Sequence, residues 1–449
     1  MKVKDNANVN PQEIVRLLVE IVGKDNVLHE PYDLIAYSRD RYPILTHPRQ
    51  GVKPVAVVRP ATTDDVREIV LLANKHRIPL TPRGSGTNYA GSAVPVKGGV
   101  VLDLTRMNKI LNINEDSMSV KVQAGVILQK LEEALNGKGF TFGHDPGSFP
   151  TATIAGCIST RSLGWRAGKY GSMGRLVVAL KVVLPTGVVV ETREVPKSST
   201  GFDFNSLFIG AEGTLGVITE ALLQIHPLPE KRVFLLYSFN SFEKAYKTLL
   251  KVLRNGLNPT SSFVEDSGDE QEANVLICYE GVKEIVKAQV KRATSILEME
   301  GGTKLDDKIA KEQWANRHDM FSQMNKEGVA DSIDTAVPTS KVFEFYEFLK
   351  EWIKRSGVKS MGIGSWVFPE NLGIDVAFDE TKAEEYAAAR DELVNKALEL
   401  GGTVSYCVGV GLRFQHLMRK EHGSAFDVMK AIKRVMDPNN IMNPGGLGL

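Results

Sequence analysis

Three stretches of this chain are rich in glycine and small hydroxyl residues, the types that let a backbone approach a ligand closely. They are 81–95 (TPRGSGTNYAGSAVP), 143–171 (GHDPGSFPTATIAGCISTRSLGWRAGKYG) and 210–219 (GAEGTLGVIT). Glycine allows the close approach, and backbone N–H and side-chain O–H groups supply hydrogen-bond donors. A mononucleotide would need only one such turn. Three turns, each set between apolar runs, predict one extended ligand that is held at several points.

The first stretch contains a run that suits a phosphate group. Successive backbone N–H groups in a tight turn can form a nest that binds an anion. The neighbouring Arg83 is either a phosphate partner or a solvated loop charge, and a tight turn between strands is the other explanation of the whole loop. The residues of the run are Gly84, Ser85, Gly86, Thr87 and Asn88.

Alternating strands and helices must position these stretches in the first half of the chain. We expect strands at 55–58, 78–80, 100–104 and 119–122, helices at 11–23, 64–76 and 128–136, and a hairpin of 176–184 with 188–192. The first strand–helix–strand unit runs directly into the loop that holds Arg83. This loop follows the carboxyl end of a strand, where such folds usually bind ligands.

After residue 229 the glycine loops disappear, and a β-α-β-β-α-β order occurs twice. The first occurrence is expected at 233–239, 242–254, 260–265, 275–280, 282–299 and 303–305, and the second at 332–337, 341–354, 362–368, 373–378, 383–400 and 403–407. Thr381 and Glu384 have the spacing of a capping box for the last helix. Two ferredoxin-like units side by side would form one broad antiparallel sheet with helices on one face, so the predicted fold class is α+β.

Length and composition restrict the function classes. A chain of 449 residues with 43% apolar and 24% charged residues predicts a globular protein of two or three domains. A net charge of +1 without a basic run argues against a nucleic-acid partner. Three distant cysteines, Cys157, Cys278 and Cys407, indicate a reducing compartment. No signal peptide or transmembrane run is apparent, so we expect a cytoplasmic protein without a transmembrane segment.

The three stretches also resemble a known family. PRGSGTNYAG, then DPGSFPTATIAGCISTRSLG with KYG, and then GAEGTLGVITEA are similar, in this order, to the flavin-contacting segments of the vanillyl-alcohol oxidase/p-cresol methylhydroxylase (PCMH-type) family. Within it, alkylglycerone-phosphate synthase-like and glycolate/D-lactate dehydrogenase-like (FAD-linked oxidase) members are most similar. The resemblance implies an FAD-binding domain over 1–228, a substrate (cap) domain over 229–407 and a C-terminal segment over 408–449 that packs back on the flavin.

The resemblance implies which residues contact FAD. The diphosphate needs N–H groups, and the ring needs an apolar slot with a base or charge near N5. The implied residues are Pro82, Arg83, Gly84, Ser85, Gly86, Thr87, Asn88 and Gly91; His144, Pro146, Gly147, Ser148, Thr153, Gly156, Cys157, Ser159, Thr160, Gly164, Tyr170 and Gly171; Glu212, Gly213, Thr214, Gly216 and Ile218; and Asn443.

Two positions, Thr87 and His144, bear on how FAD is held. Relatives that attach flavin covalently often have a histidine where this chain has Thr87, so we expect noncovalent FAD, although a histidine from the cap domain could still serve. Of the histidines, His144 is the best placed by sequence to lie near the flavin. Its alternative role is that of a hydrogen-bonded loop residue.

The active-site motifs of the relatives are missing here. In relatives that oxidise 2-hydroxy acids, H-x-G-D-G-N-L-H and E-H-G supply metal ligands and a catalytic histidine, whereas this chain has WVFPENLG at 366–373 and CVG at 407–409. The histidine run of the synthase-like members is replaced by Tyr406, Cys407 and Val408. A metal site needs several converging N, O or S donors. We therefore predict no metal.

Four residues remain as catalytic candidates. Tyr406 and Arg413 faintly resemble the tyrosine and arginine with which 4-hydroxybenzyl alcohol oxidases hold a phenolate, so we expect them to form the acid/base and anion-holding pair, with His416 as an alternative base. Arg317 matches the arginine that binds the substrate carboxylate in hydroxy-acid dehydrogenases, where a guanidinium forms a bidentate pair. The lysine that assists it in some relatives is Ser332 here. Structural roles are the alternative for each of these residues.

The resemblance implies an FAD-dependent oxidoreductase. It would take a hydride from a CH–OH or related carbon of a small organic substrate, a 2-hydroxy acid or an aromatic alcohol, to flavin N5. Because the chain has no cysteine cluster for an iron–sulfur centre, the electrons would pass to a partner, an iron–sulfur protein or an electron-transfer flavoprotein. The chain itself could form a homodimer. The alternatives are an alkylglycerone-phosphate synthase-like non-redox flavoenzyme and a flavin-bearing subunit of a larger complex.

Overall fold

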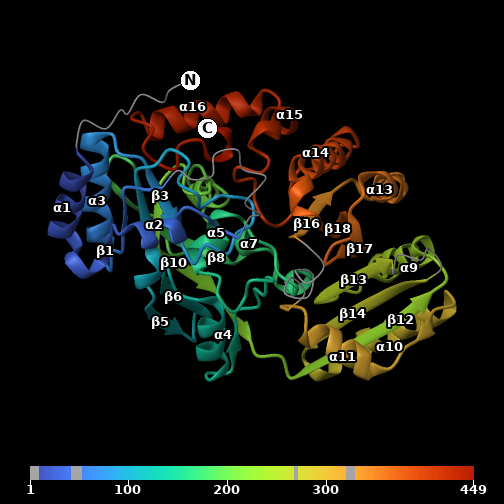
Figure 1. The fold of residues 1–449 in the computed structure, drawn as a ribbon. Coiled ribbons are helices and arrows are strands. Elements are labelled where there is room, and N and C mark those ends of the chain that lie inside the picture. The colour runs from blue at the N-terminus through green and yellow to red at the C-terminus, as the bar shows by residue number, and fades with distance from the viewer. Residues whose placement is uncertain (1–9, 42–52, 267–271, 320–328) are drawn as a thin grey trace.

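The computed structural model describes residues 10–41, 53–266, 272–319 and 329–449, so residues 1–9 of the expected first domain lie outside the described part. Two lobes are visible in Figure 1. The first lobe contains the N-terminal half of the chain, and the cap lobe contains the broad sheet of the second half. The C-terminal helix α16 (Ala425–Met436) lies against the first lobe, and α15 (Met418–His422) before it contacts α14 (Ala383–Glu399) of the cap lobe through Lys420.

The first lobe is built on two sheets. One has the order β1-β2-β4-β3, in which β2, β4 and β3 are parallel, and the other is antiparallel with the order β5-β6-β10-β8-β9. Their strands are β1 (Val27–Leu28), β2 (Ala56–Val58), β3 (Leu80–Arg83), β4 (Val100–Asp103), β5 (Ile110–Asn114), β6 (Ser119–Gln123), β8 (Val177–Val183), β9 (Val189–Glu191) and β10 (Val217–Gln224). The hairpin of β8 and β9 confirms the predicted pairing.

Helices cover these two sheets. They are α1 (Pro11–Val22), α2 (Pro31–Tyr37), α3 (Thr63–His76), α4 (Leu128–Asn136), α5 (Ile154–Ser159), α6 (Ala167–Tyr170), α7 (Met173–Leu176) and α8 (Phe204–Phe208). The short strands β7 (Phe140–Thr141) and β11 (His226–Pro227) pair with each other.

Helix α3 fixes where the first glycine stretch begins. The Thr62 hydroxyl accepts a hydrogen bond from the Asp65 amide at 3.0 Å, and the Asp65 carboxylate accepts from the Thr62 amide at 3.2 Å, which forms a capping box. The helix ends at Arg77, whose φ of 54° reverses the chain into β3. The predicted strand–helix–strand unit is therefore present, and the loop from Gly84 follows the carboxyl end of β3.

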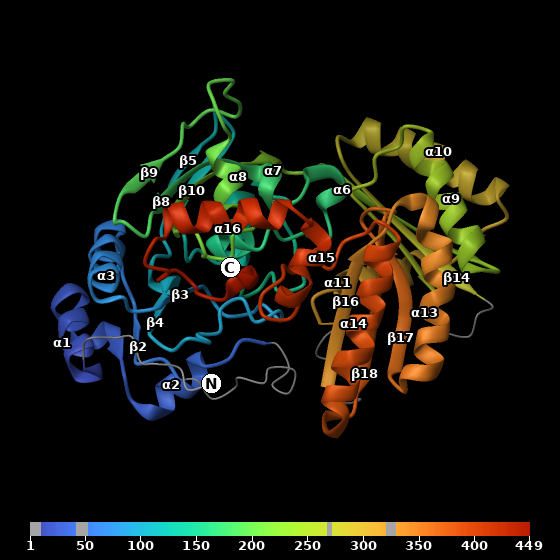
Figure 2. The ribbon, with the colours of Figure 1, turned by 90° about the horizontal axis from the view of Figure 1, so that it is seen from above.

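The cap lobe is one seven-stranded antiparallel sheet with the order β15-β12-β14-β13-β17-β18-β16. Its strands are β12 (Lys231–Phe239), β13 (Ser261–Asp266), β14 (Ala273–Gly281), β15 (Thr303–Lys304), β16 (Val329–Ala336), β17 (Lys359–Trp366) and β18 (Asn371–Phe378). Its helices are α9 (Phe242–Arg254), α10 (Lys283–Met299), α11 (Asp307–Ala315), α13 (Val342–Ser356) and α14 (Ala383–Glu399). Figure 2 shows α9, α10, α13 and α14 along one face of the sheet, as the repeated order predicted.

Two details of the predicted repeat are wrong. No strand forms at 403–407, where the contact with β16 is a single bridge between Thr403 and Ala336. The capping box of Thr381 and Glu384 is also absent. Asp379 instead accepts from the Thr381 amide at 2.9 Å, and α14 begins after Lys382 without a side-chain cap.

Each lobe has its own apolar core. The first core includes Ile14 near the start of the chain and Ile225 at the end of the second sheet, and the second core runs from Leu235 to Leu417. The end of the chain rejoins the first core through Ile441 and Met442. Within the described ranges, no helix is both long and apolar enough to cross a membrane.

Candidate active site

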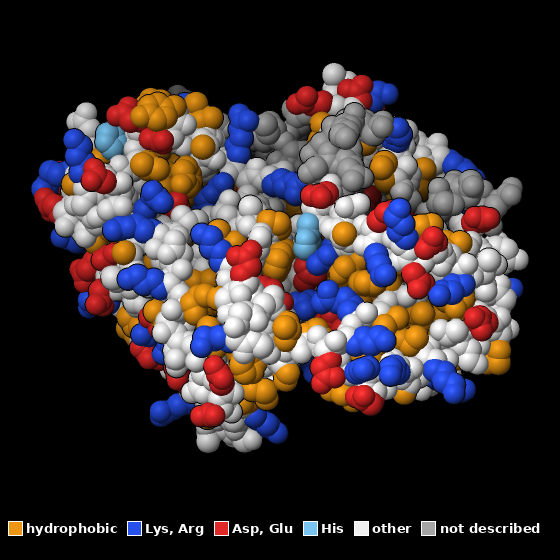
Figure 3. Space-filling model, turned by 90° about the horizontal axis from the view of Figure 1, so that it is seen from below, with side chains coloured by type: hydrophobic (Ala, Val, Ile, Leu, Met, Phe, Trp, Pro, Cys, Tyr) orange, Lys and Arg blue, Asp and Glu red, His pale blue; other side chains and the backbone are white. Residues whose placement is uncertain are grey.

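One large cavity lies where the first lobe and the cap lobe meet. It encloses about 1750 Å³ that no protein atom fills, part of it open to solvent. Residues of all three glycine-rich stretches line it, and so do residues of β13, β16, β17 and β18. Figure 3 shows the molecule from below, where Lys and Arg side chains gather at the junction of the two lobes.

The first stretch packs tightly against the second at this cavity. A Cβ added to Gly84 would lie 2.1 Å from Thr153 Oγ1, so only glycine lets the two stretches touch there. Gly86 has a φ of +70°, which favours glycine. The Asn88 side-chain amide donates to the Val408 carbonyl at 2.7 Å and so ties the loop to the C-terminal segment. These contacts hold the loop, of which residues 84–88 line the cavity, at the cavity wall.

Arg83 supports the loop from its back. Its Nη1 donates to the Arg39 carbonyl at 2.6 Å, and its guanidinium lies 5.2 Å from the centre of the Tyr37 ring. A Cβ on Gly86 would lie 2.1 Å from Arg83 Nη2, so the guanidinium packs directly against the turn. Arg83 and Arg41 both line the cavity and bring positive charge to this end.

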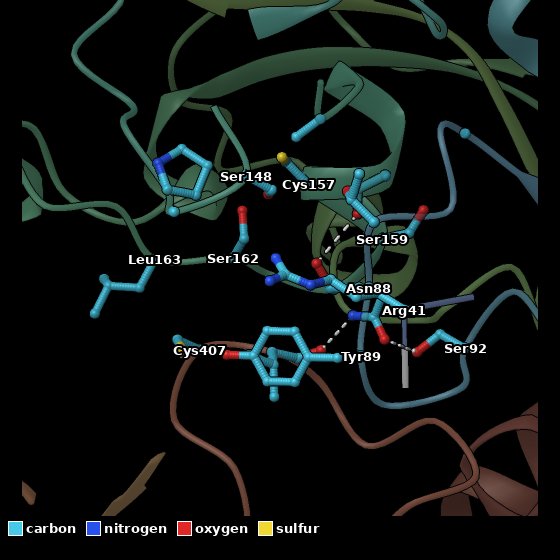
Figure 4. A pocket seen from close by; sticks show the side chains of 18 of the residues that line it. Arg41, Asn88, Tyr89, Ser92, Ser148, Cys157, Ser159, Ser162, Leu163 and Cys407 are labelled. Carbon is cyan, nitrogen blue, oxygen red and sulfur yellow. Dashed lines mark hydrogen bonds between the residues drawn. The ribbon is translucent and has the colours of Figure 1, made fainter. Parts of the chain in front are cut away.

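The second stretch brings hydroxyl and thiol groups to the opposite wall. Figure 4 shows Ser148, Cys157, Ser159 and Ser162 around the cavity, with Asn88 and Tyr89 of the first stretch across from them. Ser162 was not among the predicted contacts, although it lies in the same hydroxyl-rich stretch.

His144 lies one layer behind this wall. Its Nε2 is 2.8 Å from Ser162 Oγ, and only 1% of its surface is exposed. Burial lowers the pKa of His144 to about 4, so the imidazole is neutral near pH 7. His144 therefore contacts the cavity only through Ser162.

Glu212 and Asn443 join the third stretch to the end of the chain. The buried Glu212 carboxylate accepts from the Val410 and Gly411 amides at 2.6 and 2.9 Å. The Asn443 side-chain amide donates to the Glu212 carbonyl at 2.7 Å and to the Ser92 carbonyl at 3.0 Å. The C-terminal segment is thus bound to two of the three stretches.

Most of the predicted FAD contacts line the cavity. Those that do are Pro82, Arg83, Gly84, Ser85, Gly86, Thr87, Asn88, Pro146, Gly147, Ser148, Thr153, Gly156, Cys157, Ser159, Thr160, Glu212, Gly213, Gly216 and Ile218. The remaining predicted contacts lie outside the lining, namely Gly91, His144, Gly164, Tyr170, Gly171, Thr214 and Asn443. Gly164 is a clear case of a supporting residue, since a Cβ there would lie 2.5 Å from the Asp145 amide nitrogen.

The structure does not bring Tyr406, Arg413 and His416 to the cavity lining. The Tyr406 hydroxyl donates to Glu370 Oε1 at 3.0 Å, and burial together with Glu370 raises the pKa of the phenol. Arg413 is fully buried, with Nη2 donating to Asp331 Oδ2 at 2.8 Å. His416 is half-exposed and lies 2.7 Å from the Asp391 carboxylate.

Arg317 does line the cavity, but a carboxylate of the first lobe already holds it. Its Nε and Nη2 donate to Asp145 Oδ2 at 2.9 and 2.8 Å. His318 Nε2 lies 2.6 Å from the other Asp145 oxygen. Burial alone would raise the pKa of Asp145, yet His318 and Arg317 lower it to about 2. The charge of Arg317 is therefore largely balanced before any ligand binds.

Sequence reasoning missed a group of acids on the cap side of the cavity. Glu265, Asp334 and Asp375 line it from three strands. Asp334 accepts from Trp366 Nε1 at 2.9 Å, from Ser332 Oγ at 3.2 Å and from Cys407 Sγ at 3.3 Å. Acidic residues inside the predicted strands of the cap sheet were the available signal. Across the described ranges, no three His, Cys, Asp or Glu side chains are arranged to hold a metal ion.

The comparisons with known proteins agree with this arrangement. Residues 54–193 match the FAD binding domain model, and residues 228–447 match the model of the C-terminal domain of FAD linked oxidases. The chain is 29% identical to the glycolate oxidase subunit GlcD of Bacillus subtilis, with 97% of this chain and 96% of that protein covered. It is 32% identical to a D-lactate dehydrogenase of Anaerostipes hadrus, with 88% and 89% covered.

Two solved structures share the fold. An alkyldihydroxyacetonephosphate synthase aligns over 99% of this chain and 86% of its own with a TM-score of 0.80 at 22% identity. A p-cresol methylhydroxylase aligns over 98% and 96% with a TM-score of 0.83, also at 22% identity. Since the two family models cover most of the chain and the relatives match nearly its full length, this protein belongs to the FAD-linked oxidase family and is an FAD-dependent oxidoreductase.

Proposed function

We propose that this protein is a dehydrogenase that removes a hydride from a CH–OH or related carbon of a small organic substrate and passes the electrons to a separate protein. The observation that carries the proposal is the continuous cavity, which joins the glycine-rich stretches of the first lobe to the polar face of the cap sheet. Such a cavity can hold a flavin nucleotide and a substrate end to end.

The glycine loop fits the diphosphate of FAD. A Cβ at Gly84 would collide with Thr153 of the second stretch, and a Cβ at Gly86 would collide with the Arg83 guanidinium behind the turn. The N–H groups from Gly84 to Asn88, with Arg41 nearby, would face the phosphates, and the hydroxyl and thiol wall of Cys157, Ser159 and Ser162 would face the flavin end. When bound, FAD supplies a hydride acceptor that the chain itself lacks. With threonine at position 87, we propose noncovalent binding.

Aromatic residues enclose the substrate end. The rings of Trp165 and Trp366 lie 5.2 Å apart between centroids, and Trp165 also meets Phe263 at 6.1 Å. This wall would exclude water from the reacting carbon and so strengthen the polar contacts around it. Aromatic alcohols suit such a wall, whereas 2-hydroxy acids are suggested by the names of the two relatives. For an acid, the free N–H groups of Arg317 would orient the carboxylate.

The electrons must leave the protein after the substrate is oxidised. Cys157, Cys278 and Cys407 do not cluster, because Cys157 lies in α5, Cys278 in β14 and Cys407 in the C-terminal segment. An iron–sulfur protein or an electron-transfer flavoprotein is therefore the proposed acceptor.

Anaerobic mixing with candidate substrates tests the proposal. The purified holoprotein is mixed with 2-hydroxy acids and with aromatic alcohols while the flavin absorbance is followed. Bleaching by a member of either class, and recovery of the colour when an artificial electron acceptor is added, is the expected result. The alternative is an alkylglycerone-phosphate synthase-like enzyme. If every compound leaves the flavin oxidised, and the protein instead joins two added substrates through an ether bond, the protein is a non-redox flavoenzyme.

A further inference from the structure

A row of four residues crosses the cap sheet on the face that lines the cavity. Glu265 of β13 pairs with Gly364 of β17, Gly364 pairs with Gly373 of β18, and Gly373 pairs with Asp334 of β16. Directly opposed residues of antiparallel strands point to the same face. All four residues line the cavity. The two glycines form a low floor between two carboxylates whose Cα atoms are about 14 Å apart, three strand spacings. The Phe263 ring lies beside Gly364, and Asp334 Oδ1 lies over Gly373.

Asp375 stands beside this floor. It lies two residues from Gly373 on the same face of β18, and it is paired directly with Ser332 of β16. The Ser332 hydroxyl, directly across from Asp375, donates to Asp334 Oδ2 at 3.2 Å. Cys407 Sγ donates to the same oxygen, and Trp366 Nε1 donates to Asp334 Oδ1. Asp334 is therefore held in place by hydrogen bonds, and Asp375 beside it lines the same cavity.

The charges around Asp375 are mainly negative. Asp334 faces it from β16 and Glu265 from β13, the Tyr89 phenol of the first stretch is close to Asp334 and Asp375, and Asp331 adds negative charge from the opposite face of the sheet. On the C-terminal segment, the charge of Arg413 is balanced by Asp331, at 2.8 Å, and the Cys407 thiol lies against Asp334. Burial, and then Asp334, raise the pKa of Asp375 to about 7. Two neighbouring acids with different surroundings are a common basis for acid and base roles.

We propose that Asp375 accepts the proton of the substrate hydroxyl, and that the acidic floor selects alcohols flanked by hydroxyl or ammonium donors rather than by a carboxylate. This inference rests on the proposed function and names its base and its substrate class. Tyr406 and Arg413 would then serve only to hold the fold around Glu370 and Asp331.

The reaction balances with these groups. The reacting carbon would lose a hydride, with its two electrons, to bound FAD, and the Asp375 carboxylate would take the proton of the hydroxyl oxygen. The substrate becomes the corresponding carbonyl compound, and protonated Asp375 returns its proton to solvent after the product leaves. A substrate carboxylate at the floor would face Glu265, Asp334 and Asp375, and like charges in a site with little water repel strongly.

Three compounds with the same CH₃–CHOH carbon frame separate the substrate classes, namely lactate, 1,2-propanediol and 1-amino-2-propanol. Each is mixed anaerobically with the holoprotein, and both the rate of flavin reduction and the binding-induced shift of the flavin spectrum are measured. We expect the diol or the amino alcohol to bind at least about tenfold more tightly than lactate. Lactate as the preferred compound would overturn the inference, and so would failure of both donor compounds to bind.

Variants identify the base. Asp375→Asn should slow flavin reduction about 100-fold and remove the rise in rate that the wild type shows as pH increases through about 7. Asp334→Asn should strengthen lactate binding and weaken amino alcohol binding, and Glu265→Gln should do the same if Asp334→Asn does not fold. The exposed Asp116→Asn is the matched control.

The outcomes distinguish this inference from the proposed function. Fast reduction by lactate with an unchanged pH profile in Asp375→Asn contradicts the inference but leaves a flavin dehydrogenase. If neither these three compounds nor the 2-hydroxy acids and aromatic alcohols of the wider panel reduce the flavin, the proposed function fails, and the binding order of the three compounds in wild type and Asp334→Asn still tests the acidic floor. FAD content and melting temperature of each variant confirm that it is folded.

Discussion

At Gly84, a single missing side chain decides whether two segments of the first lobe can meet. The contact with Thr153 leaves no space for a Cβ, and the same loop carries the N–H groups assigned to the diphosphate. The glycine and hydroxyl residues predicted a loop after β3, and the structure places this loop at the cavity wall. The sequence did not predict which polar residues of the cap face the cavity. Arg413 and Asp331 pair inside the lobe, whereas Asp334, three residues further along, faces outward, and only the register of β16 decides between them.

Replacing Gly84 by valine tests the fit of the loop. The new side chain would strike Thr153, so the two stretches must separate, and we expect the FAD content of the purified protein to fall at least about tenfold. Flavin absorbance per chain is the measurement. Gly137→Ala is the control, because a Cβ there meets nothing closer than 3.6 Å. Full FAD content in Gly84→Val would show that the loop is not a diphosphate site.

At the scale of elements, local signals predicted most of the helices and strands. The βαβ unit ahead of the first loop and the repeated β-α-β-β-α-β order follow from apolar periodicity, which packing in both lobes preserves. The strand expected at 403–407 was wrong because regular pairing with β16 stops after the Thr403–Ala336 bridge, although the Tyr406 amide still donates to the Asp334 carbonyl of β16 at 3.1 Å. The alternation of apolar and polar residues that predicts a strand cannot show whether a partner strand lies beside it.

The capping box that forms at α3 and the predicted capping box that does not form at α14 offer a direct comparison. Thr62→Ala removes the hydroxyl that accepts from the Asp65 amide at the start of α3, so the free energy of unfolding should fall by about 1 kcal/mol. Thr381→Ala removes no cap, because α14 has no side-chain cap, so the free energy of unfolding should fall by clearly less than in Thr62→Ala. Denaturant unfolding of both variants and the wild type measures the difference. Equal losses would mean that the capping box of α3 contributes nothing measurable.

The whole molecule depends on contacts between its lobes. Asp145 of the first lobe holds Arg317 and His318 of the cap lobe, and the buried Arg166 guanidinium pairs with Glu132 at 2.9 Å and with Glu280 of the cap sheet at 3.4 Å. These contacts fix the cap sheet over the glycine-rich stretches and so determine the shape of the cavity. Nothing in the local sequence predicted the contacts that cross between the lobes, because their partners are more than a hundred residues apart.

The Asp145 contact has a defined pH dependence. The pKa of Asp145 is lowered from 3.8 to about 2 in the folded protein, so its ionised form stabilises the fold above pH 4, and this stability is lost as the pH falls from about 4 to about 2. The pH-dependent part is about 2 kcal/mol. The difference in unfolding free energy between wild type and Asp145→Asn should be constant from pH 5 to 7 and shrink below about pH 4. A difference that does not change with pH would refute the assignment.

The mode of flavin attachment is also a property of the whole molecule. With Thr87 at the position where covalent relatives have a histidine, acid or heat precipitation should release FAD and leave a colourless pellet. The supernatant is analysed for FAD, and the pellet for visible absorbance. A yellow pellet would show a covalent bond, and the eight histidines of the chain would then be replaced one at a time to find it.

Removal of a hydride from a carbinol carbon is the central claim, and isotope substitution tests it most directly. The best alcohol substrate is prepared with deuterium in place of hydrogen on that carbon, and single-turnover flavin reduction is followed anaerobically for both forms. We expect the deuterated form to bind equally well, to reduce the flavin several times more slowly and to yield the carbonyl product. A flavin that both forms reduce at the same rate, or that neither reduces while product forms, would contradict hydride removal from that carbon.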